Sequence, residues 1–330
     1  MLCTLPVAVS PTTVFLHRGR MTEVVVFIRS MVFLGTQIVS YPMLYQIKQF
    51  WPDCRVRVVA QDDVGKHYLS LPWVDAFVRA NTLSENYRAL GGQADLMIAL
   101  HFASEKFGLV GLARRPRFRL GFKNGRMTDF VWTHSHRKNF AEYMGLSNMR
   151  LLGALKPFDP EIAARQCLLD IAARRHLTPD ATDVVLMPGG GAGDYKRWPI
   201  ALYVALADRL LTLLGPDTTF SFVLGPDEQN EYAWLQGLNR AEFRFAMTRP
   251  LPEIAHLVLH ARLIVANDCG PSHLAQFACV PYVGVFHEPN REWFWARPYS
   301  ADVIPRDNST EIRHVALQDV LDACSQVLQA

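Results

Sequence analysis

The sequence predicts an α/β fold of two similar halves, each built on a parallel sheet flanked by helices. In both halves, short runs rich in β-branched residues alternate with helix-length segments, which is the pattern of strand–helix–strand units. The 330 residues are enough for two domains of about 150 residues each. Half of the residues are hydrophobic and 20% are charged, an ordinary globular composition that excludes disorder and collagen-like repeats.

The first half contains four clear strand patterns and a fifth that is less regular. A helical pattern follows the first of them and ends at about residue 50. The predicted strands cover residues 24–28, 55–60, 76–79, 96–100 and 117–122. We therefore assign residues 21–156 to an N-terminal domain, preceded by an extension over residues 1–20 that lacks strand-like sequence.

The second half repeats the alternation after a helix and connector over residues 157–180. Its predicted strands cover residues 183–187, 219–224, 263–265 and 282–285, and its predicted helices cover residues 201–214, 228–238, 253–260 and 271–279. We assign residues 181–310 to a C-terminal domain and residues 311–330 to a final amphipathic helix. One face of that helix carries Leu317, Val320, Leu321, Cys324 and Leu328.

Two uncharged runs, residues 30–47 and 269–287, contain too many Gly, Pro and Gln residues for a membrane span of about 20 apolar positions. The first 20 residues lack the basic start and apolar centre of a signal peptide. The six cysteines form no Cys-x-x-Cys pair, so we expect reduced thiols and no metal site. The pattern indicates a cytoplasmic protein.

The net charge of +3 is unevenly distributed. Residues 114–138 contain eight basic residues and one acidic residue, a net +7, so the rest of the chain sums to −4. Such a segment forms either a solvated face or a docking surface for an anionic partner, such as a membrane surface.

The most informative stretch is the turn from Ala266 to His273. It follows an apolar strand and opens a helical segment, with Pro271 at the first helical position, where its missing N–H is tolerated. Unpaired backbone N–H groups and the helix dipole, about half an elementary charge, make such a turn an anion site. The turn is suited to phosphate.

Two further segments follow predicted strands. Residues 187–199 bring the backbone of Gly189 and Gly190 close to a ligand and then add the positive charges of Lys196 and Arg197. Residues 225–228 place Glu228 where a carboxylate can accept hydrogen bonds from a ribose. Neither a Walker motif nor a Gly-x-Gly-x-x-Gly turn after the first strand is present, which argues against a P-loop enzyme and a dehydrogenase.

Three elements, taken in order, resemble the ADP-heptose lipopolysaccharide heptosyltransferases, a glycosyltransferase family 9-like pattern that covers most of the chain after Met21. They are Pro188-Gly189 with Lys196-x-Trp198-Pro199, then Gly225-Pro226-Asp227-Glu228, then Asn267-Asp268-x-Gly270-Pro271-x-His273. The resemblance implies a GT-B fold, two Rossmann-like domains facing across a cleft. It implies inverting transfer of a sugar from a nucleotide diphosphate to a lipopolysaccharide core or related glycan, without a cofactor or metal.

The same resemblance assigns roles to single residues. Lys196 would neutralise the donor diphosphate and Glu228 would bind the ribose. The turn that starts at Asp268 would hold the diphosphate and sugar through its backbone and His273. The full expected donor set is Gly189, Gly190, Lys196, Glu228, Asp268, Cys269, Gly270, Ser272 and His273.

The first half departs from the family pattern at the catalytic position. Family members carry an aspartate after the first strand, taken as the general base, and this chain has Thr36 there. A threonine hydroxyl cannot accept a proton near neutral pH. His101, which follows the strand at residues 96–100, is the expected substitute, with Glu105 one helical turn later to orient it. A loop histidine without a catalytic part is the other interpretation.

Two other functions stay open at this point. One is a sugar-nucleotide-binding protein with little transferase activity, which Thr36 makes credible. The other is a nucleotide-sugar epimerase on the same fold. The expected partners are a nucleotide-sugar donor, a glycan or glycolipid acceptor and, through residues 114–138, the anionic surface of the inner membrane. No nucleic acid is expected.

Overall fold

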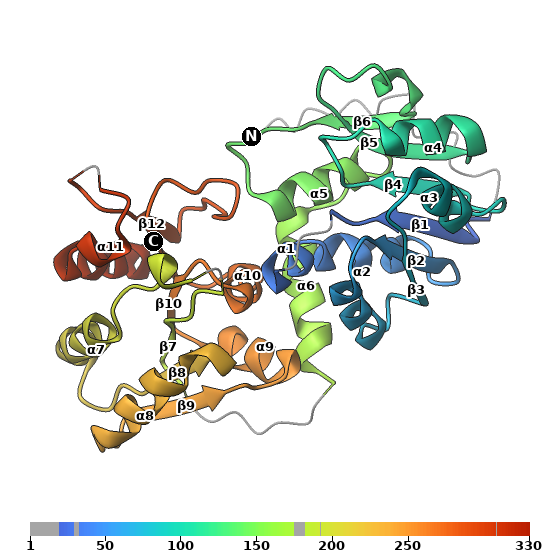
Figure 1. Ribbon diagram of the computed structural model, residues 1–330. Coiled ribbons are helices and arrows are strands. Elements are labelled where there is room, and N and C mark those ends of the chain that lie inside the picture. The colour runs from blue at the N-terminus through green and yellow to red at the C-terminus, as the bar shows by residue number, and fades with distance from the viewer. Residues whose placement is uncertain (1–19, 30–32, 175–181, 192, 308) are drawn as a thin grey trace, which may run out of the picture.

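A computed structural model describes residues 20–29, 33–174, 182–191, 193–307 and 309–330. Among these residues the chain forms two six-stranded sheets, one in each half, and the strand pairs within both sheets are parallel. In Figure 1 the first half, blue to green, lies beside the second half, yellow to red. Most of the predicted extension at residues 1–20 lies outside the described residues.

The first sheet has the strand order β3-β2-β1-β4-β5-β6. Its strands are β1 Glu23–Phe27, β2 Arg55–Ala60, β3 Ala76–Arg79, β4 Leu96–Ala99, β5 Phe118–Lys123 and β6 His134–Arg137. The helices of this half are α1 Leu34–Ile38, α2 Tyr41–Phe50, α3 Leu83–Leu90, α4 Lys106–Arg114 and α5 Met144–Gly153. This strand order is that of a Rossmann-like sheet.

The second sheet has the order β12-β11-β10-β7-β8-β9, which repeats the first when its strands are renumbered from β7. Its strands are β7 Val184–Met187, β8 Phe220–Leu224, β9 Phe243–Met247, β10 Leu263–Asn267, β11 Tyr282–Val285 and β12 Ser300–Val303. Its helices are α7 Ile200–Leu214, α8 Gln229–Gly237, α9 Leu251–His260, α10 Gly270–Phe277 and α11 Leu317–Gln329. The prediction of two Rossmann-like domains is confirmed.

The central strands are apolar because helices cover both faces of a parallel sheet. Every residue of β7 and β10 is buried, and in β1 only Glu23 is not. Three strands of the described chain were not predicted: β6, β9 and β12. All three lie at sheet edges, where one side is open and the side chains include charged or polar residues, as in His134-Ser135-His136-Arg137.

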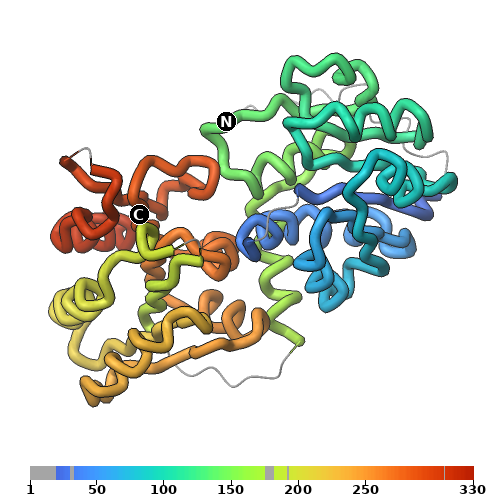
Figure 2. The backbone as a smooth tube through the Cα atoms, in the orientation of Figure 1, coloured from blue at the N-terminus to red at the C-terminus, as the bar shows by residue number. Residues whose placement is uncertain are grey.

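The predicted connector contains a helix, α6 Pro160–Ala172, that packs against both halves. It contacts α2 in the first half and α9 and α10 in the second, and Figure 2 shows it between the two. The buried faces of these helices belong to one apolar core. Residues 175–181 of the expected connector lie outside the described residues. None of the described helices is both long and apolar enough to cross a membrane.

Candidate functional site

Three neighbouring strands bring the candidate ligand segments together. Strands β10, β7 and β8 are adjacent in the second sheet, and residues 268–273, 188–199 and 225–228 follow their carboxyl ends. Ligands of open α/β sheets bind at this edge, where the strand order reverses. Here the reversal lies between β7 and β10, so the sheet itself juxtaposes the glycine-rich segment and the turn at Cys269.

A cavity of about 260 Å³ opens between these segments. Five residues of the expected donor set line it: Gly189, Gly190, Glu228, Cys269 and Gly270. Leu34 also lines the cavity, and because Leu34 begins α1 it brings the first half into contact with this site. The cavity therefore lies at the junction of the halves, although most of its wall belongs to the second.

Lys196 and Asp268 form an ion pair next to the cavity. The Lys196 Nζ lies 2.5 Å from Asp268 Oδ2, and the Asn290 amide donates to the same oxygen over 3.2 Å. Only 20% of the lysine side chain and 11% of the aspartate side chain are exposed. Lys196 and the turn at Cys269 thus lie on one shared site, with the positive charge of Lys196 held in place by Asp268.

Glu228 is buried and held by two groups. Its Oε2 accepts from the Gly225 backbone N–H over 2.7 Å, and its Oε1 pairs with Arg197 over 3.1 Å. The carboxylate lies against Gly189, where a Cβ atom would come within 3.2 Å of Oε2. The sequence analysis assigned Arg197 only a positive charge; the structure shows that it links the glycine-rich segment to Glu228.

A buried amide fixes the geometry between two of the segments. Asn267, at the end of β10, donates to the Pro188 carbonyl over 2.7 Å and accepts from the Tyr203 hydroxyl over 2.8 Å. Both residues are buried. The sequence motif included Asn267 but suggested no role for it, and nothing in the sequence pointed to Tyr203.

The turn before α10 is closed by its own side chains. The Ser272 hydroxyl donates to the Cys269 carbonyl over 2.7 Å, and the Ser272 N–H reaches the same carbonyl. Cys269 has an extended backbone at the helix start and lines the cavity together with Gly270 and Pro271. The positive end of α10 therefore faces the cavity.

His273 lies where the two halves touch. Its Nδ1 is 3.2 Å from the Tyr143 hydroxyl and 3.3 Å from the Gln276 amide nitrogen. A Cβ on Gly35 would lie 3.2 Å from its Nε2, so only glycine lets α1 come this close without a shift. Burial lowers the pKa of His273 to about 4.

The tautomer of His273 follows from its neighbour. The Gln276 side-chain oxygen accepts from the Trp295 N–H and its nitrogen donates to the Trp293 carbonyl, so the nitrogen also donates to His273. His273 Nδ1 is then the acceptor, and the proton of the neutral ring is on Nε2, on the side of Gly35. The ring can donate one hydrogen bond from that side.

The far wall of the cavity was not predicted. It consists of Thr248, Arg249, Leu251 and Ile254. These residues follow β9, a strand that the sequence pattern did not reveal, and Thr248 adopts a positive φ of 49° directly after it. Because the sequence analysis did not predict β9, it did not predict the cavity wall that follows this strand either.

In the first half, the expected catalytic side chains are bonded to the backbone. The Thr36 hydroxyl, on α1, donates to the Phe33 carbonyl over 2.7 Å. His101 stacks on Phe107, and its Nε2 donates to the Ile28 carbonyl over 2.8 Å, since a carbonyl can only accept. Burial lowers the pKa of His101 to about 4.

The expected partnership of Glu105 with His101 is wrong. The Glu105 carboxylate instead accepts from the backbone N–H groups of Met127 and Thr128, each over 3.0 Å. Glu105 directly precedes α4, so these two bonds fasten the loop between β5 and β6 to the start of that helix. His101 Nδ1 has no hydrogen-bond partner within the part of the chain that the structure describes.

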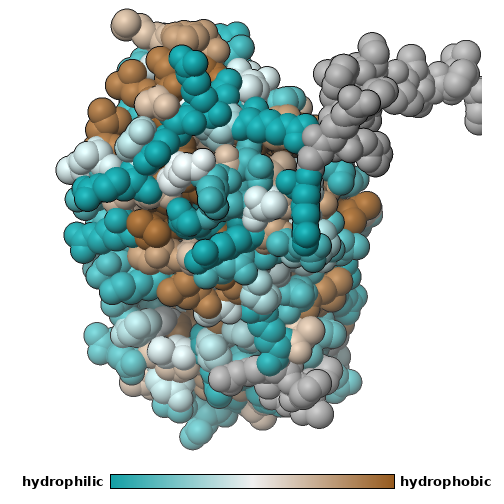
Figure 3. Space-filling view, turned by 90° about the vertical axis from the view of Figure 1, so that its right-hand side faces the viewer, coloured by the Kyte–Doolittle hydropathy of each residue, from teal (hydrophilic) through white to brown (hydrophobic). Residues whose placement is uncertain are grey.

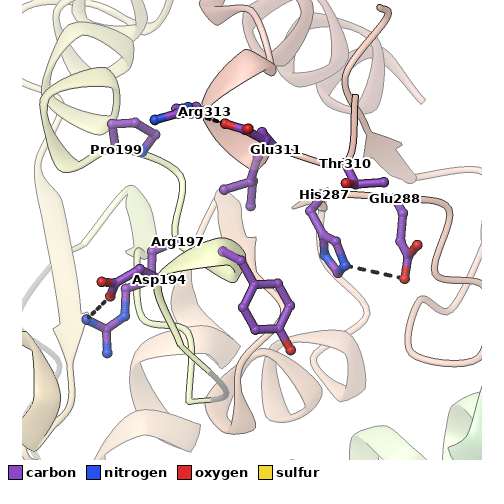
Figure 4. Close-up of a pocket in the computed structure, with 10 residues that line it drawn as sticks. Asp194, Arg197, Pro199, His287, Glu288, Thr310, Glu311 and Arg313 are labelled. Carbon is purple, nitrogen blue, oxygen red and sulfur yellow. Dashed lines mark ion pairs between the residues drawn. The ribbon is translucent and has the colours of Figure 1, made fainter. Parts of the chain in front are cut away.

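A second hollow of about 770 Å³, drawn in Figure 4, is lined by Arg197, His287 and Glu288 and by residues 310–313. Polar side chains around it contact one another: Arg197 and Asp194 over 3.3 Å, His287 and Glu288 over 3.3 Å, and Arg313 and Glu311. None of the residues expected from the sequence to bind a donor lines it. Among the described residues, no group of three His, Cys, Asp or Glu side chains is placed to hold a metal ion.

The fold resembles several solved structures at low sequence identity. A glycosyltransferase family 9 protein from Veillonella parvula is 16% identical, with a TM-score of 0.64 over 94% of this chain and 98% of that one. E. coli heptosyltransferase WaaC with ADP is 15% identical, with a TM-score of 0.65 over 94% and 100%. UDP-GlcNAc 2-epimerase from Methanocaldococcus jannaschii is 12% identical, with a TM-score of 0.56 over 94% and 93%.

These similarities establish the fold. They do not distinguish a transferase from an epimerase, because both kinds of enzyme have this fold. A comparison with curated protein sequences found no match. The family model of glycosyltransferase family 9 (heptosyltransferase), however, matches residues 88–314, more than two thirds of the chain. This range includes all three segments around the cavity. The chain belongs to glycosyltransferase family 9, the heptosyltransferase family.

Proposed function

We propose that this glycosyltransferase moves a heptose-type sugar from a nucleotide diphosphate to a hydroxyl of a lipopolysaccharide core or related glycan, with inversion at the anomeric carbon. The observation that supports it most is the single cavity lined by Gly189, Glu228 and Cys269, with the Lys196–Asp268 pair beside it. Three segments that are distant in sequence meet there, as a donor with base, ribose and diphosphate requires.

The donor would lie along the cavity with its base at one end and its diphosphate at the other. The base would occupy the end formed by Thr248, Arg249 and Ile254, and the ribose hydroxyls would donate to Glu228. The diphosphate would then reach the start of α10, where backbone N–H groups and the helix dipole favour anions. Lys196 adds a charge-assisted contact.

In the transfer step, the acceptor oxygen bonds to the anomeric carbon while the bond from that carbon to the diphosphate oxygen breaks. The diphosphate leaves with its electron pair, so negative charge grows on the oxygen next to Lys196 and α10. Hydrogen-bond donors and charges that are already in place before the reaction stabilise such charge most. The N–H of His273 on the side of Gly35 would stabilise the sugar or the diphosphate in the same way.

The acceptor hydroxyl must lose a proton, and His101 is the proposed base. Its Nε2 carries the proton shared with Ile28, which leaves Nδ1 to accept. A ring with a pKa of about 4 is a weak base, so we expect transfer to be slow. Thr36 would position the acceptor rather than take its proton.

The alternative function is that of a sugar-nucleotide-binding protein with little transferase activity. Thr36 favours it, because this position would otherwise supply a base worth about 10²–10⁴-fold in rate. The alternative keeps the donor site unchanged and removes only the transfer step.

One experiment distinguishes these functions. ADP-, GDP- and UDP-sugars are first screened for binding, and the donor that binds is incubated with lipopolysaccharide core acceptors and without any acceptor. Release of nucleoside diphosphate that depends on the acceptor supports the transferase. Tight binding with no acceptor-dependent release supports the binding protein, and isomerisation of the sugar without acceptor would indicate an epimerase.

A further inference from the structure

The basic segment at residues 114–138 does not form one surface. Arg114, Arg115 and Arg117 lie around the amino end of β5, beside residues 90–95. Lys123 and Arg137 lie at the carboxyl ends of β5 and β6, around a shared hollow. Six residues of strand separate the two groups by about 20 Å, so these basic residues do not share one surface.

Apolar side chains accompany only the second group. Met127 is 87% exposed and Phe130 is 73% exposed, the two highest values among the large hydrophobic residues of the described chain. Both lie in the loop between β5 and β6, and Figure 3 shows apolar residues among hydrophilic ones at the top of this face, where Figure 1 places that loop. We call Lys123, Arg126, Met127, Phe130 and Arg137 the β5–β6 tip.

The loop that carries these side chains is held in place from behind. The Asp129 carboxylate accepts from the N–H groups of Asn124 and Arg126, and Glu105 accepts from those of Met127 and Thr128. Thr128 packs so closely on Gly108 of α4 that a Cβ there would lie 2.2 Å from its hydroxyl oxygen. Since the backbone is fixed, the exposure of Met127 and Phe130 is a built feature of the fold.

The apolar surface continues on α4. Leu109 and Leu112 are 44% and 39% exposed and lie three residues apart, on one face of the helix. That face adjoins Gly108 and Gly111, against which the loop packs. Exposed apolar side chains surrounded by Lys and Arg are the pattern of a surface that inserts into the headgroup region of an anionic bilayer.

We propose that the β5–β6 tip docks this protein onto anionic lipid bilayers. Charge alone would also suit a soluble phosphorylated glycan, but such a ligand gives Met127 and Phe130 no reason to be exposed. A bilayer satisfies both features at once, because the basic side chains meet lipid phosphates while the apolar ones enter the acyl boundary.

The position of the tip fits a lipid-borne acceptor. The tip extends from the carboxyl edge of the first sheet, the same edge at which Ile28 and His101 lie. Strand β5 is two strands away from β1, a distance of about 10 Å across the sheet. Docking there would place the membrane along the edge of the sheet that carries His101. Lipid binding does not depend on sugar transfer, so failure of the proposed function would leave this inference intact.

The test is cosedimentation of the full chain with phosphatidylcholine vesicles, with and without one third of phosphatidylglycerol. The apolar variant combines Met127→Ser and Phe130→Ser, and its control combines Ile162→Ser and Leu213→Ser, which are 57% and 49% exposed elsewhere. The charge variant combines Lys123→Gln, Arg126→Gln and Arg137→Gln, and its control changes Arg114, Arg115 and Arg117 to Gln. Circular dichroism checks that each variant folds.

We expect binding to the anionic vesicles only. The apolar variant should lose at least about tenfold in affinity, and the charge variant should lose about 100-fold, at about fivefold for each basic residue. Both controls should bind within about twofold of the wild type, and added salt should weaken binding. Absence of binding to anionic vesicles, or equal losses in the variants and their controls, would overturn the proposal. Loss in the charge variant alone would do so too, since it would show that Met127 and Phe130 do not enter the bilayer, as the proposal requires.

Discussion

The two halves share one strand order but differ in what the ends of their strands carry. In the second half, the segments after β7, β8 and β10 converge on a cavity, with Glu228 and Lys196 each held by an oppositely charged partner. In the first half, the corresponding edge carries Thr36 and His101; the Thr36 hydroxyl and His101 Nε2 each donate to a backbone carbonyl. The same topology therefore carries the proposed donor site in one half and the proposed catalytic position in the other. This difference predicts that changes in the second half alter donor binding, whereas changes in the first half alter the rate.

The largest effect is expected from Thr36→Asp. A carboxylate would supply a base one residue after Gly35, the glycine that lies against His273 and Gly270, and we expect acceptor-dependent transfer to rise by about 10²–10⁴-fold, roughly 3–5.5 kcal/mol of barrier. Donor affinity should stay unchanged. Initial rates of nucleoside diphosphate release measure it.

Thr36→Asn is the matched control, because it has nearly the same shape as aspartate but no basic oxygen. If the asparagine variant gains as much as the aspartate variant, the effect is one of packing. If neither gains, Thr36 does not limit the rate and the halves do not differ as described.

The next effect concerns His273 and pH. Its pKa is about 4 in the folded protein against an ordinary value of 6.5, so the unfolded chain binds a proton that the folded chain excludes. The stability that comes from this difference is complete above pH 6.5 and is lost as the pH falls towards 4. When the pH is lowered from about 7.5 to about 5, the free energy of unfolding of His273→Gln should therefore fall by about 2 kcal/mol less than that of the wild type.

Urea unfolding at the two pH values measures this difference. Other buried histidines, including His101, contribute equally to both proteins and cancel in the comparison. If the free energy of unfolding falls equally in wild type and variant, His273 is not kept neutral by its position between the halves.

A smaller effect is expected from Gly189→Ala. The new Cβ would lie 3.2 Å from Glu228 Oε2, tighter than ordinary contact, so the carboxylate must move by a few tenths of an ångström. We expect donor affinity to fall roughly fivefold, about 1 kcal/mol, because the ribose contact is disturbed. Calorimetric titration with the donor measures it.

Gly191→Ala, in the same segment, serves as the control, since a Cβ there meets no atom of the described residues within 4 Å. Equal losses at Gly189 and Gly191 would mean that the ligand, rather than Glu228, meets the new methyl group. In that case the position assigned to the ribose is wrong.

How much the sequence predicts depends on burial. The central strand β11 Tyr282–Val285 was predicted with its observed bounds, because an apolar run between turns indicates burial on both faces of the sheet. The edge strands β6, β9 and β12 were missed, because a strand with one open side carries mixed residues. Missing β9 also concealed Thr248 and Arg249, the far wall of the cavity.

The candidate site shows the same limit. Glycines, a lysine and a Gly-Pro turn have local signatures, and the structure brings Gly189, Lys196 and Cys269 to one site, as the motifs suggested. Contacts between segments that are distant in sequence leave no such local signature. The residues around Tyr143 do not indicate that its hydroxyl contacts His273, 130 positions later. The residues around Glu105 do not indicate that its carboxylate binds the backbone at Met127 instead of the His101 ring.

The central claim is that Lys196 and the start of α10 hold the diphosphate of the donor. The most direct test is a calorimetric cycle in which the preferred nucleoside diphosphate and its monophosphate are each titrated into the wild type and Lys196→Ala. We predict that Lys196→Ala weakens diphosphate binding by about 10- to 100-fold, roughly 1.5–3 kcal/mol, and monophosphate binding far less. Equal affinities of the wild type and Lys196→Ala for the diphosphate would contradict the claim.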